Sequence, residues 1–563
     1  MTYKQTAWVK NSREATGQDQ LGLRFFSETI YQDLLPNITN VTSRGRYYSF
    51  YPWLIWSVEK RFDDLKDYSL QKIVRRADCL LTLIGLYHNY ISDNSGHSLH
   101  DGLVGAKKLS SVLAEMLESG EMAQLSTYAI EEESSDRYFK NKFGGLGQYY
   151  FGPLRDAGIL AYNEKNEINY TEDRGLIIAE AFDQSVNGDD FFEVLKNDWV
   201  TENDLENLLD FCPCRLSVNP AEQNTLIDFL FSRIEIFQHP LWENRRKSLT
   251  SILDFIESSN NLGLEMKIDS TGVHNFLGSA YSSAFHNQVL WNDELEQTSE
   301  TKILWRQYYA GELLSYAVQA LFWAGLTKLT EDERIVLNSK DYGSWFGEVF
   351  GSALPEFVGS NFTEIVNEIT LNLPEITDRN SPNHEIYLTR QLEQTVKDKW
   401  LPNRQEKIVV LATQILLTLA ARFENNRLNF PVSFTNQQLN EYPINLTNFI
   451  YYAGNDWRTM KLNEWLAWLA TKWGVETHLM IALRKLQQES LDTFKVFPSE
   501  EGLQVKEFIG DKTIEEILMP GFTSPRLRTT FQILLDLGLL TIENESLILT
   551  PTGKNLLEEI TYG

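Results

Sequence analysis

The stretch PRLRTTFQILLDLGLLTIENESLILTPTGKNLLEEI, Pro525–Ile560, decides the fold of the C-terminal part of the sequence. Its first helical pattern ends at Gly538, and glycine ends a helix readily because it adopts the left-handed conformation without strain. The apolar runs LLTI and LILT follow, separated by a short polar turn, and are typical of a β-hairpin. A further helix begins past Gly553. Helix, hairpin and helix in this order are typical of a winged helix.

A second segment has the same order of elements. In FGGLGQYYFGPLRDAGILAYNEKNEINYTEDRGLIIAEAF, residues 143–182, a helix ends at Gly158 and the next begins after Gly175. Between them, ILAYN and INYT pair across the turn EKNE. The sequence therefore predicts two winged-helix units, at about residues 135–185 and about residues 510–563.

Helical periodicity dominates the remaining sequence. In SLQKIVRRADCLLTLIGLY the apolar residues recur at spacings of three and four, and Ser69 is a suitable N-cap. Ile303–Leu326 repeats this pattern, and Leu462–Gln488 indicates two helices separated near Gly474. We predict a mainly α, multi-domain helical protein with two small winged-helix units. The predicted domains are 1–190, 191–440 and 441–563.

Composition limits the partners that the chain can bind. Its 563 residues include 51 Lys and Arg against 78 Asp and Glu, which gives a formal net charge of −27. Such a chain repels nucleic acid, so any DNA contact needs a local basic patch or a basic partner. The longest apolar run, Ile408–Ala421, is shorter than the roughly 20 residues of a membrane-spanning helix and indicates a buried core helix. With few cysteines and no apolar signal sequence, we expect a cytoplasmic protein with no membrane segment.

The stretch TSRGRYYSFYPWLIW, Thr42–Trp56, combines two arginines with six aromatic residues. In one interpretation it is part of the core, and its arginines bond to carbonyl groups or to Asp19. In the other it is a basic edge for a nucleic acid or a partner, with tyrosines available for stacking. The candidate binding residues in this stretch are Arg44, Arg46, Tyr47 and Tyr48.

Basic residues also lie around both predicted winged helices. Those of the first unit are Arg137, Lys140, Lys142 and Arg155, and those of the second are Arg526, Arg528 and Lys554. All of these except Lys554 are candidate binding residues. The hairpin turns are acidic or nearly so, because NEKNE has one lysine between two glutamates and IENES has no basic residue. Charge sign therefore favours protein contacts over DNA contacts, and the first unit is the better DNA candidate.

Cysteine and histidine spacing gives little indication of a metal site. Cys212 and Cys214 form C-P-C rather than C-x-x-C, and no histidine pair stands near them in the sequence. His97 and His100 form H-x-x-H, which is either half of a metal site or part of a polar loop. We predict no metal and no cofactor.

A weak catalytic pattern lies at Glu265 and Lys267, whose E-x-K spacing occurs in restriction-type, Mg²⁺-dependent nucleases. Such a site needs a further carboxylate on a preceding strand, and the upstream candidate, Asp254, lies in a helical pattern. The sequence contains no P-loop, no G-x-S-x-G and no H-E-x-x-H motif. We predict no catalytic residue, with the nuclease as an alternative.

The motifs D-x-L-G at residues 19–22, T-x-R-x-R-Y-Y at residues 42–48 and P-W-L at residues 52–54 together carry a family resemblance. This order resembles the opening of uncharacterised bacterial proteins encoded beside helicases and nucleases in anti-phage defence islands. The resemblance implies an accessory or sensing subunit of a multi-gene defence system and assigns no catalytic residue.

The predicted function is a non-enzymatic scaffold or a DNA- or partner-recognition subunit of a bacterial anti-phage defence complex. Its predicted partners are other subunits of that complex, with double-stranded DNA at a local basic patch as the second candidate. A further alternative is a kleisin-like bridge to an SMC-type ATPase, because winged helices near both ends suit that role.

Overall fold

The structure, a computed structural model, describes residues 13–14, 19–61, 69–92, 100–291, 296–425, 432–452, 457–489, 491–506, 508–509 and 512–562. The chain forms two compact units, each assembled from segments that are distant in the sequence. Unit 1 comprises Met1–Tyr31, Leu277–Asn292 and Lys302–Thr523, and unit 2 comprises Gln32–Phe276, Asp293–Thr301 and Ser524–Gly563. These units do not follow the predicted boundaries at residues 190 and 440, because the C-terminal segment packs with the first half of the chain.

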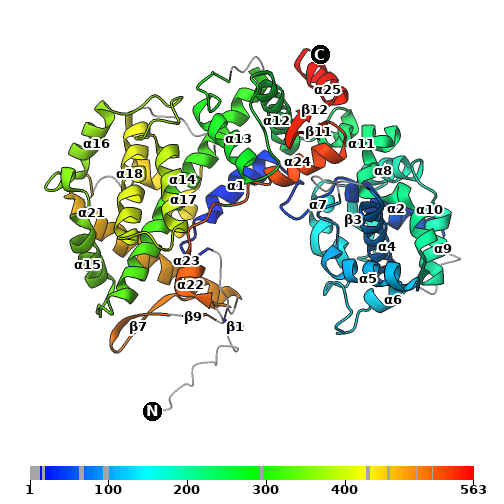
Figure 1. Cartoon of the computed structure of the whole chain (residues 1–563), viewed down its shortest axis with the longest axis horizontal. Coiled ribbons are helices and arrows are strands. Elements are labelled where there is room, and N and C mark those ends of the chain that lie inside the picture. The colour runs from blue at the N-terminus through cyan, green and yellow to red at the C-terminus, as the bar shows by residue number, and fades with distance from the viewer. Residues whose placement is uncertain are drawn as a thin grey trace. The chain divides into compact units, whose positions relative to one another are not determined.

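Unit 2 is built mainly from helices (Figure 1). Its longer helices are α2 (Tyr47–Lys60), α4 (Leu70–Ile91), α5 (Ala106–Ser119), α8 (Arg174–Asp183), α9 (Gly188–Asn197), α11 (Pro220–Leu230), α12 (Glu243–Asn261), α24 (Leu527–Asp536) and α25 (Pro551–Tyr562). Short elements between them are β2 (Ala123–Gln124), α6 (Leu125–Tyr128), the π-helical turn η1 (Leu146–Tyr150), α7 (Phe151–Asp156), β5 (Trp199–Val200), α10 (Glu202–Asn207), η2 (Leu209–Phe211) and η3 (Pro213–Val218).

Unit 1 is also helical. Its helices are α15 (Ser339–Gly351), α16 (Phe362–Leu371), α17 (Glu385–Lys397), α18 (Arg404–Asn425), α19 (Asn436–Glu441), α21 (Leu462–Trp468), η8 (Leu469–Glu476), α22 (Thr477–Glu489) and α23 (Ile514–Leu518). Three further helices contribute residues to both units, namely α1 (Arg24–Leu34), α13 (Ser270–Ser282) and α14 (Glu296–Glu331). Short strands form two-stranded pairs, β1 (Arg13–Glu14) with β6 (Leu491–Asp492), β7 (Val496–Ser499) with β8 (Gly502–Val505), and β9 (Phe508–Ile509) with β10 (Lys512–Thr513).

The mainly helical fold and both hairpins are confirmed. In the first predicted winged-helix segment β3 (Leu160–Tyr162) pairs with β4 (Ile168–Tyr170), and in the second β11 (Leu540–Glu543) pairs with β12 (Ser546–Leu549). A helix precedes and follows each hairpin, as predicted. Ser69 caps α4 through a hydrogen bond from the Lys72 backbone amide.

The predicted break near Gly474 is wrong. Residues 469–476 form a π-helical segment between α21 and α22, so the helical path continues through Gly474. A Cβ on Gly474 would lie 3.5 Å from the Phe322 ring, which is an ordinary van der Waals distance. Local signals favour a helix end at a glycine, whereas the helix here continues through a widened turn.

Helix α2 forms the core of unit 2. Every residue from Tyr47 to Ser57 is buried, so the helix is surrounded on all sides by protein. It packs against α8, β4, α11, α4 and η1. Pro52 lies inside α2, and the helix continues through it. Because the aromatic stretch enters the core, any charged group beside it needs a buried partner.

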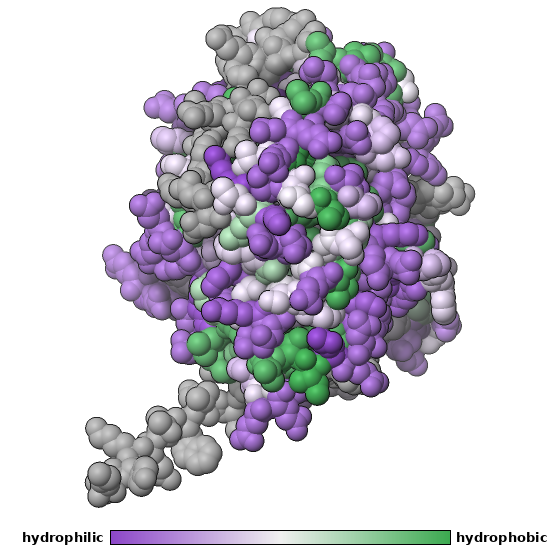
Figure 2. All heavy atoms as spheres, turned by 90° about the vertical axis from the view of Figure 1, so that its left-hand side faces the viewer, coloured by the Kyte–Doolittle hydropathy of each residue, from purple (hydrophilic) through white to green (hydrophobic). Residues whose placement is uncertain are grey.

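One face of unit 1 is mainly hydrophilic. Figure 2 shows the side of unit 1 where α15, α16 and α21 lie, and hydrophilic residues cover most of this face. Apolar residues gather there in a few small groups. Among the described helices, none combines the length and the apolarity that crossing a bilayer requires.

Candidate metal centre

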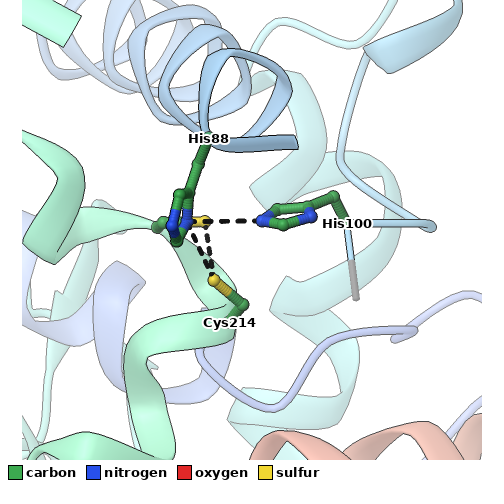
Figure 3. A group of neighbouring side chains, drawn as sticks. His88, His100 and Cys214 are labelled. Carbon is green, nitrogen blue, oxygen red and sulfur yellow. Dashed lines mark hydrogen bonds between the residues drawn. The ribbon is translucent and has the colours of Figure 1, made fainter. Parts of the chain in front are cut away.

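Four side chains with metal-binding atoms converge in unit 2. His88 lies in the last turn of α4, and His100 lies in the segment that leads to α5. Cys212 lies between η2 and η3, and Cys214 lies in η3. Figure 3 shows the side chains of His88, His100 and Cys214 pointing toward one another.

The distances within this His₂Cys₂ cluster match those of a metal site. Cys214 Sγ lies 3.1 Å from His88 Nδ1 and 3.2 Å from Cys212 Sγ. His100 Nε2 lies 3.3 Å from His88 Nδ1, and all four ligand atoms lie within 4.8 Å of one another. Bond lengths of about 2.0–2.3 Å to a tetrahedral Zn²⁺ separate its ligands by about 3.3–3.8 Å. Small side-chain movements would therefore bring all four atoms around one ion.

The sequence around the cysteines holds them in place. Pro213 begins η3, where its fixed backbone angle suits a helical first position. Arg46 donates a hydrogen bond of 2.7 Å to the carbonyl oxygen of Cys212 and another to that of Asp210. The same guanidinium pairs with the buried carboxylate of Glu222 at 2.9 Å. The Arg46 side chain thus holds the C-P-C turn in place by hydrogen bonds to backbone carbonyl groups of the turn and of the preceding segment.

The environments of the two thiols shift their pKa values in opposite directions. Burial raises the pKa of Cys212 well above its usual range. Hydrogen bonds with Cys212, His100 and His88 lower the pKa of Cys214, so Cys214 loses its proton more readily than Cys212. Arg44 also acts on both sulfur atoms through its positive charge. A metal ion would displace the remaining thiol proton, because thiolate is the ligand form of cysteine.

Two sulfur and two imidazole ligands favour zinc. Zn²⁺ is commonly bound by Cys₂His₂ sets in tetrahedral sites, and sulfur ligands disfavour Mg²⁺ and Ca²⁺. Cys212 and His100 are buried, whereas His88 and Cys214 are half-buried. Since four protein ligands complete the tetrahedron, this set is typical of structural rather than catalytic zinc.

No protein-family model, no curated protein and no solved structure matches this chain. The site is therefore interpreted from its own geometry.

The sequence has no histidine pair near Cys212 and Cys214, but the fold brings two histidines to them, with His88 126 positions from Cys214. Sequence spacing therefore does not detect this cluster. His100 belongs to this cluster, and its predicted partner His97 lies outside the described residues. His88 was not identified from the sequence, and its only signal was a histidine at the end of an otherwise apolar helix.

The candidate binding residues of the aromatic stretch do not form a surface. Tyr47 and Tyr48 are buried in α2. Arg44 is 0 % exposed and pairs with Asp536 at 2.8 Å, while Arg46 is 1 % exposed and pairs with Glu222. The expected basic edge is therefore absent at these four positions, and the core interpretation applies. Asp19 is not the partner, because it accepts hydrogen bonds from the first turn of α1.

Around the first hairpin, the basic residues differ in accessibility. Lys140 and Lys142 are exposed. Arg137 is half-buried and donates to the carbonyl oxygen of Phe139 at 2.7 Å. Arg155 is exposed but pairs with Asp156 at 2.8 Å. The two lysines are the exposed cations of this group for which no ion pair is present within the described residues.

The second hairpin segment is packed into unit 2. Nine of the ten residues of α24 are buried, so this helix has no free face for a DNA groove. The half-buried Arg526 donates to the carbonyl oxygen of Leu35, whereas Arg528 is exposed. Beside β12, the backbone amide of Leu547 donates to the Met266 carbonyl at 2.7 Å. This segment therefore acts as an internal packing element.

The alternative nuclease site lacks its required geometry. Glu265 and Lys267 lie in an irregular segment rather than a strand, and Asp254 lies in α12. Lys267 pairs with Glu545 at 3.1 Å. Within the described ranges, the His₂Cys₂ cluster is the one group of at least three potential metal ligands, and it does not include Glu265.

Proposed function

We propose that this chain is a non-enzymatic scaffold and recognition subunit whose unit 2 is stabilised by one structural Zn²⁺ ion. The His₂Cys₂ cluster is the observation that supports this proposal. Its ligands come from α4, from the segment before α5 and from the C-P-C turn, so one ion would cross-link three parts of unit 2. Binding of a metal to the folded state alone stabilises that state.

The metal would also support the C-terminal helix–hairpin–helix segment. Helix α24 packs on η3, which contains Cys214, and Asp536 of α24 binds Arg44. A Cβ on Gly538 would clash with Ser217 of η3, so these segments approach closely. We assign the second predicted winged helix to internal docking and the first, which has exposed Lys140 and Lys142, to an external partner.

We further propose that the partners are the other subunits of a bacterial anti-phage defence complex. The support for this part is the sequence resemblance of the opening motifs. An acidic chain of net charge −27 is suited to docking on basic proteins. DNA at the first hairpin is the second candidate partner, with Lys140 and Lys142 as its phosphate contacts.

Metal content tests the zinc proposal directly. Protein purified without chelators should contain about one zinc ion per chain, as measured by inductively coupled plasma mass spectrometry. Cys212→Ala and Cys214→Ala together should abolish zinc binding. Cys79→Ala is the matched control, because Cys79 is a buried free cysteine of α4 that lies outside the cluster.

The contrary result is also informative. Suppose that the chain takes up no zinc and that iodoacetamide alkylates Cys214 rapidly. Cys214 would then be a reactive nucleophile activated by His88, rather than a zinc ligand. The 3.1 Å contact between Cys214 and His88 suits that role as well. A zinc-bound Cys214 thiolate would instead be protected from alkylation until a chelator removes the metal.

DNA binding is tested with labelled duplex and single-stranded DNA across a salt series with Mg²⁺ present. Specific phosphate contacts would give affinity that falls steeply with salt and falls further in Lys140→Ala/Lys142→Ala. Arg528→Ala is the control, since it removes an exposed cation of the packed second segment. Absence of binding at low salt would leave protein docking as the recognition mode. Cleavage lost in Glu265→Ala would contradict the non-enzymatic proposal.

A further inference from the structure

Arg379 of unit 1 is a buried cation, and no counter-ion for it lies among the described residues. The residue is 1 % exposed, and its three guanidinium nitrogen atoms have no hydrogen-bond partner in the described ranges. The other buried arginines in the described part of the chain each donate at least one side-chain hydrogen bond. They are Arg44, Arg46, Arg75, Arg76, Arg245, Arg404 and Arg422. Arg379 is therefore exceptional.

A second guanidinium and an imidazole lie near Arg379. Arg390 of α17 lies near enough to act on it, and burial together with the charge of Arg390 lowers the pKa of Arg379 to about 10. Burial and both guanidinium groups also lower the pKa of His286. Guanidinium stays charged even at this pKa at neutral pH, so two cations and an imidazole share one region.

The neighbouring carboxylates are already engaged. Glu385 binds the guanidinium of Arg422 at 2.8 Å and also accepts from Tyr281. Asp378 accepts a hydrogen bond of 2.8 Å from Gln288. Among the described residues, no carboxylate therefore bonds to the Arg379 nitrogen atoms, and an unpaired buried charge is destabilising.

The local backbone leaves room for this side chain. Nη1 of Arg379 lies against Gly278 of α13, where a Cβ would overlap it. Asn380 donates from Nδ2 to the carbonyl oxygen of His286 at 2.9 Å, which joins the two segments. Accessibility increases from the buried Arg379 through the half-buried Arg390 to the exposed His286. The group thus extends from the interior of unit 1 to its surface.

We propose that Arg379, Arg390 and His286 form a binding site for a phosphate-type dianion. A guanidinium donates two parallel hydrogen bonds to phosphate, and two such groups with an imidazole match an oxyanion that has several acceptor oxygens. The ligand is either free inorganic phosphate or the terminal phosphate of a nucleotide. This site lies in unit 1 and does not depend on the zinc proposal.

Thermal melting and calorimetry with inorganic phosphate test the site at constant ionic strength adjusted with sodium chloride. Wild-type protein should show a saturable rise in melting temperature, and Arg379→Met should lose this response. Arg379→Met should melt no lower than wild type in phosphate-free buffer, because it removes an unpaired charge. Arg334→Gln, an exposed arginine of the same unit, should respond like wild type.

Arg390→Gln provides a second variant in case Arg379→Met does not fold, and it should weaken phosphate binding at least tenfold. A parallel titration with a nucleoside triphosphate separates the two sources, since tighter binding than inorganic phosphate would identify a nucleotide ligand. A wild-type melting temperature that is the same in phosphate and in chloride, with no heat of binding for either ligand, would overturn the proposal.

Discussion

Arg44 and Asp536 lie 492 residues apart in the sequence and form a buried ion pair in unit 2, with nitrogen-to-oxygen distances of 2.8 and 2.9 Å. The backbone amide of Gly45 donates to the same carboxylate at 2.8 Å. This interaction joins the aromatic stretch before α2 to the end of α24. It also lies beside the C-P-C turn, because Arg44 acts electrostatically on both of its cysteines.

Removing one member of this pair should be more destabilising than removing both. Asp536→Asn leaves the Arg44 guanidinium without a counter-charge in the core, and we expect unit 2 to lose about 3–5 kcal/mol of unfolding free energy. The double variant Arg44→Met/Asp536→Leu removes both charges and should lose less. Urea unfolding of wild type, both single variants and the double variant gives the coupling energy. Additive single effects would show that the pair contributes no specific interaction.

Metal removal should destabilise unit 2 selectively. At a free zinc concentration 1,000 times the dissociation constant, zinc binding raises the free energy of unfolding by about 4 kcal/mol. For a unit of this size, each kcal/mol changes the melting temperature by about 2–4 °C. A strong chelator should therefore lower the melting temperature of unit 2 by roughly 10 °C. The variant Cys212→Ala/Cys214→Ala should melt at the same temperature with and without chelator. An equal chelator effect in this variant would assign the stabilisation to another metal site.

Local sequence signals could predict the hairpins and the helices, because each of them depends on neighbouring residues. Glycine at 158 and 538, polar turns and apolar periodicity specify these elements within a few residues. The candidate metal centre could not be predicted in this way, since the fold brings together side chains from positions 88, 100, 212 and 214. Spacing rules for zinc sites apply to ligands that share one short segment.

The ion-pair partners of the buried arginines could not be predicted from the sequence either. The aromatic density of α2 indicates burial, but nothing local distinguishes Glu222 and Asp536 among 78 acidic residues. The sequence does contain one unused packing signal, the spacing G-x-x-x-G-x-x-x-G at Gly343, Gly347 and Gly351. On a helix this spacing places three glycines on one face, which allows a second helix to approach closely.

His478 should make the stability of unit 1 sensitive to acid. Its imidazole is fully buried, with Nδ1 against the Gln20 carbonyl at 3.1 Å and Nε2 accepting from the Lys495 amide at 2.9 Å. Burial lowers the pKa of His478 from 6.5 to about 4. Between these values the unfolded chain binds a proton that the folded chain does not, so stability is full above pH 6.5 and falls as pH decreases toward 4.

The expected loss from this residue is roughly 3 kcal/mol over that interval. Urea unfolding at several pH values should give a steeper acid dependence for wild type than for His478→Gln. The variant will be less stable at neutral pH, and the comparison concerns only the slope. Equal slopes for the two proteins would contradict the assignment of this proton to His478.

The glycine face of α15 should determine how unit 1 packs. Helix α15 packs against α21, and a Cβ on Gly347 would clash with the backbone carbonyl of Asn463. Because a backbone atom cannot rotate away as a side chain can, Gly347→Ala should force the two helices apart. We expect a loss of about 1–3 kcal/mol of unfolding free energy, as for other overpacked cores.

Gly311→Ala is the matched control for this prediction. Gly311 lies within α14 in the same unit, and a Cβ there would meet nothing within 4 Å. Alanine at this position should stabilise unit 1 by up to about 1 kcal/mol, because it restricts the unfolded backbone and favours the helix. Opposite signs for the two substitutions in urea unfolding would therefore support close packing at α15. Stabilisation by both alanines would mean that α15 and α21 do not make this close contact.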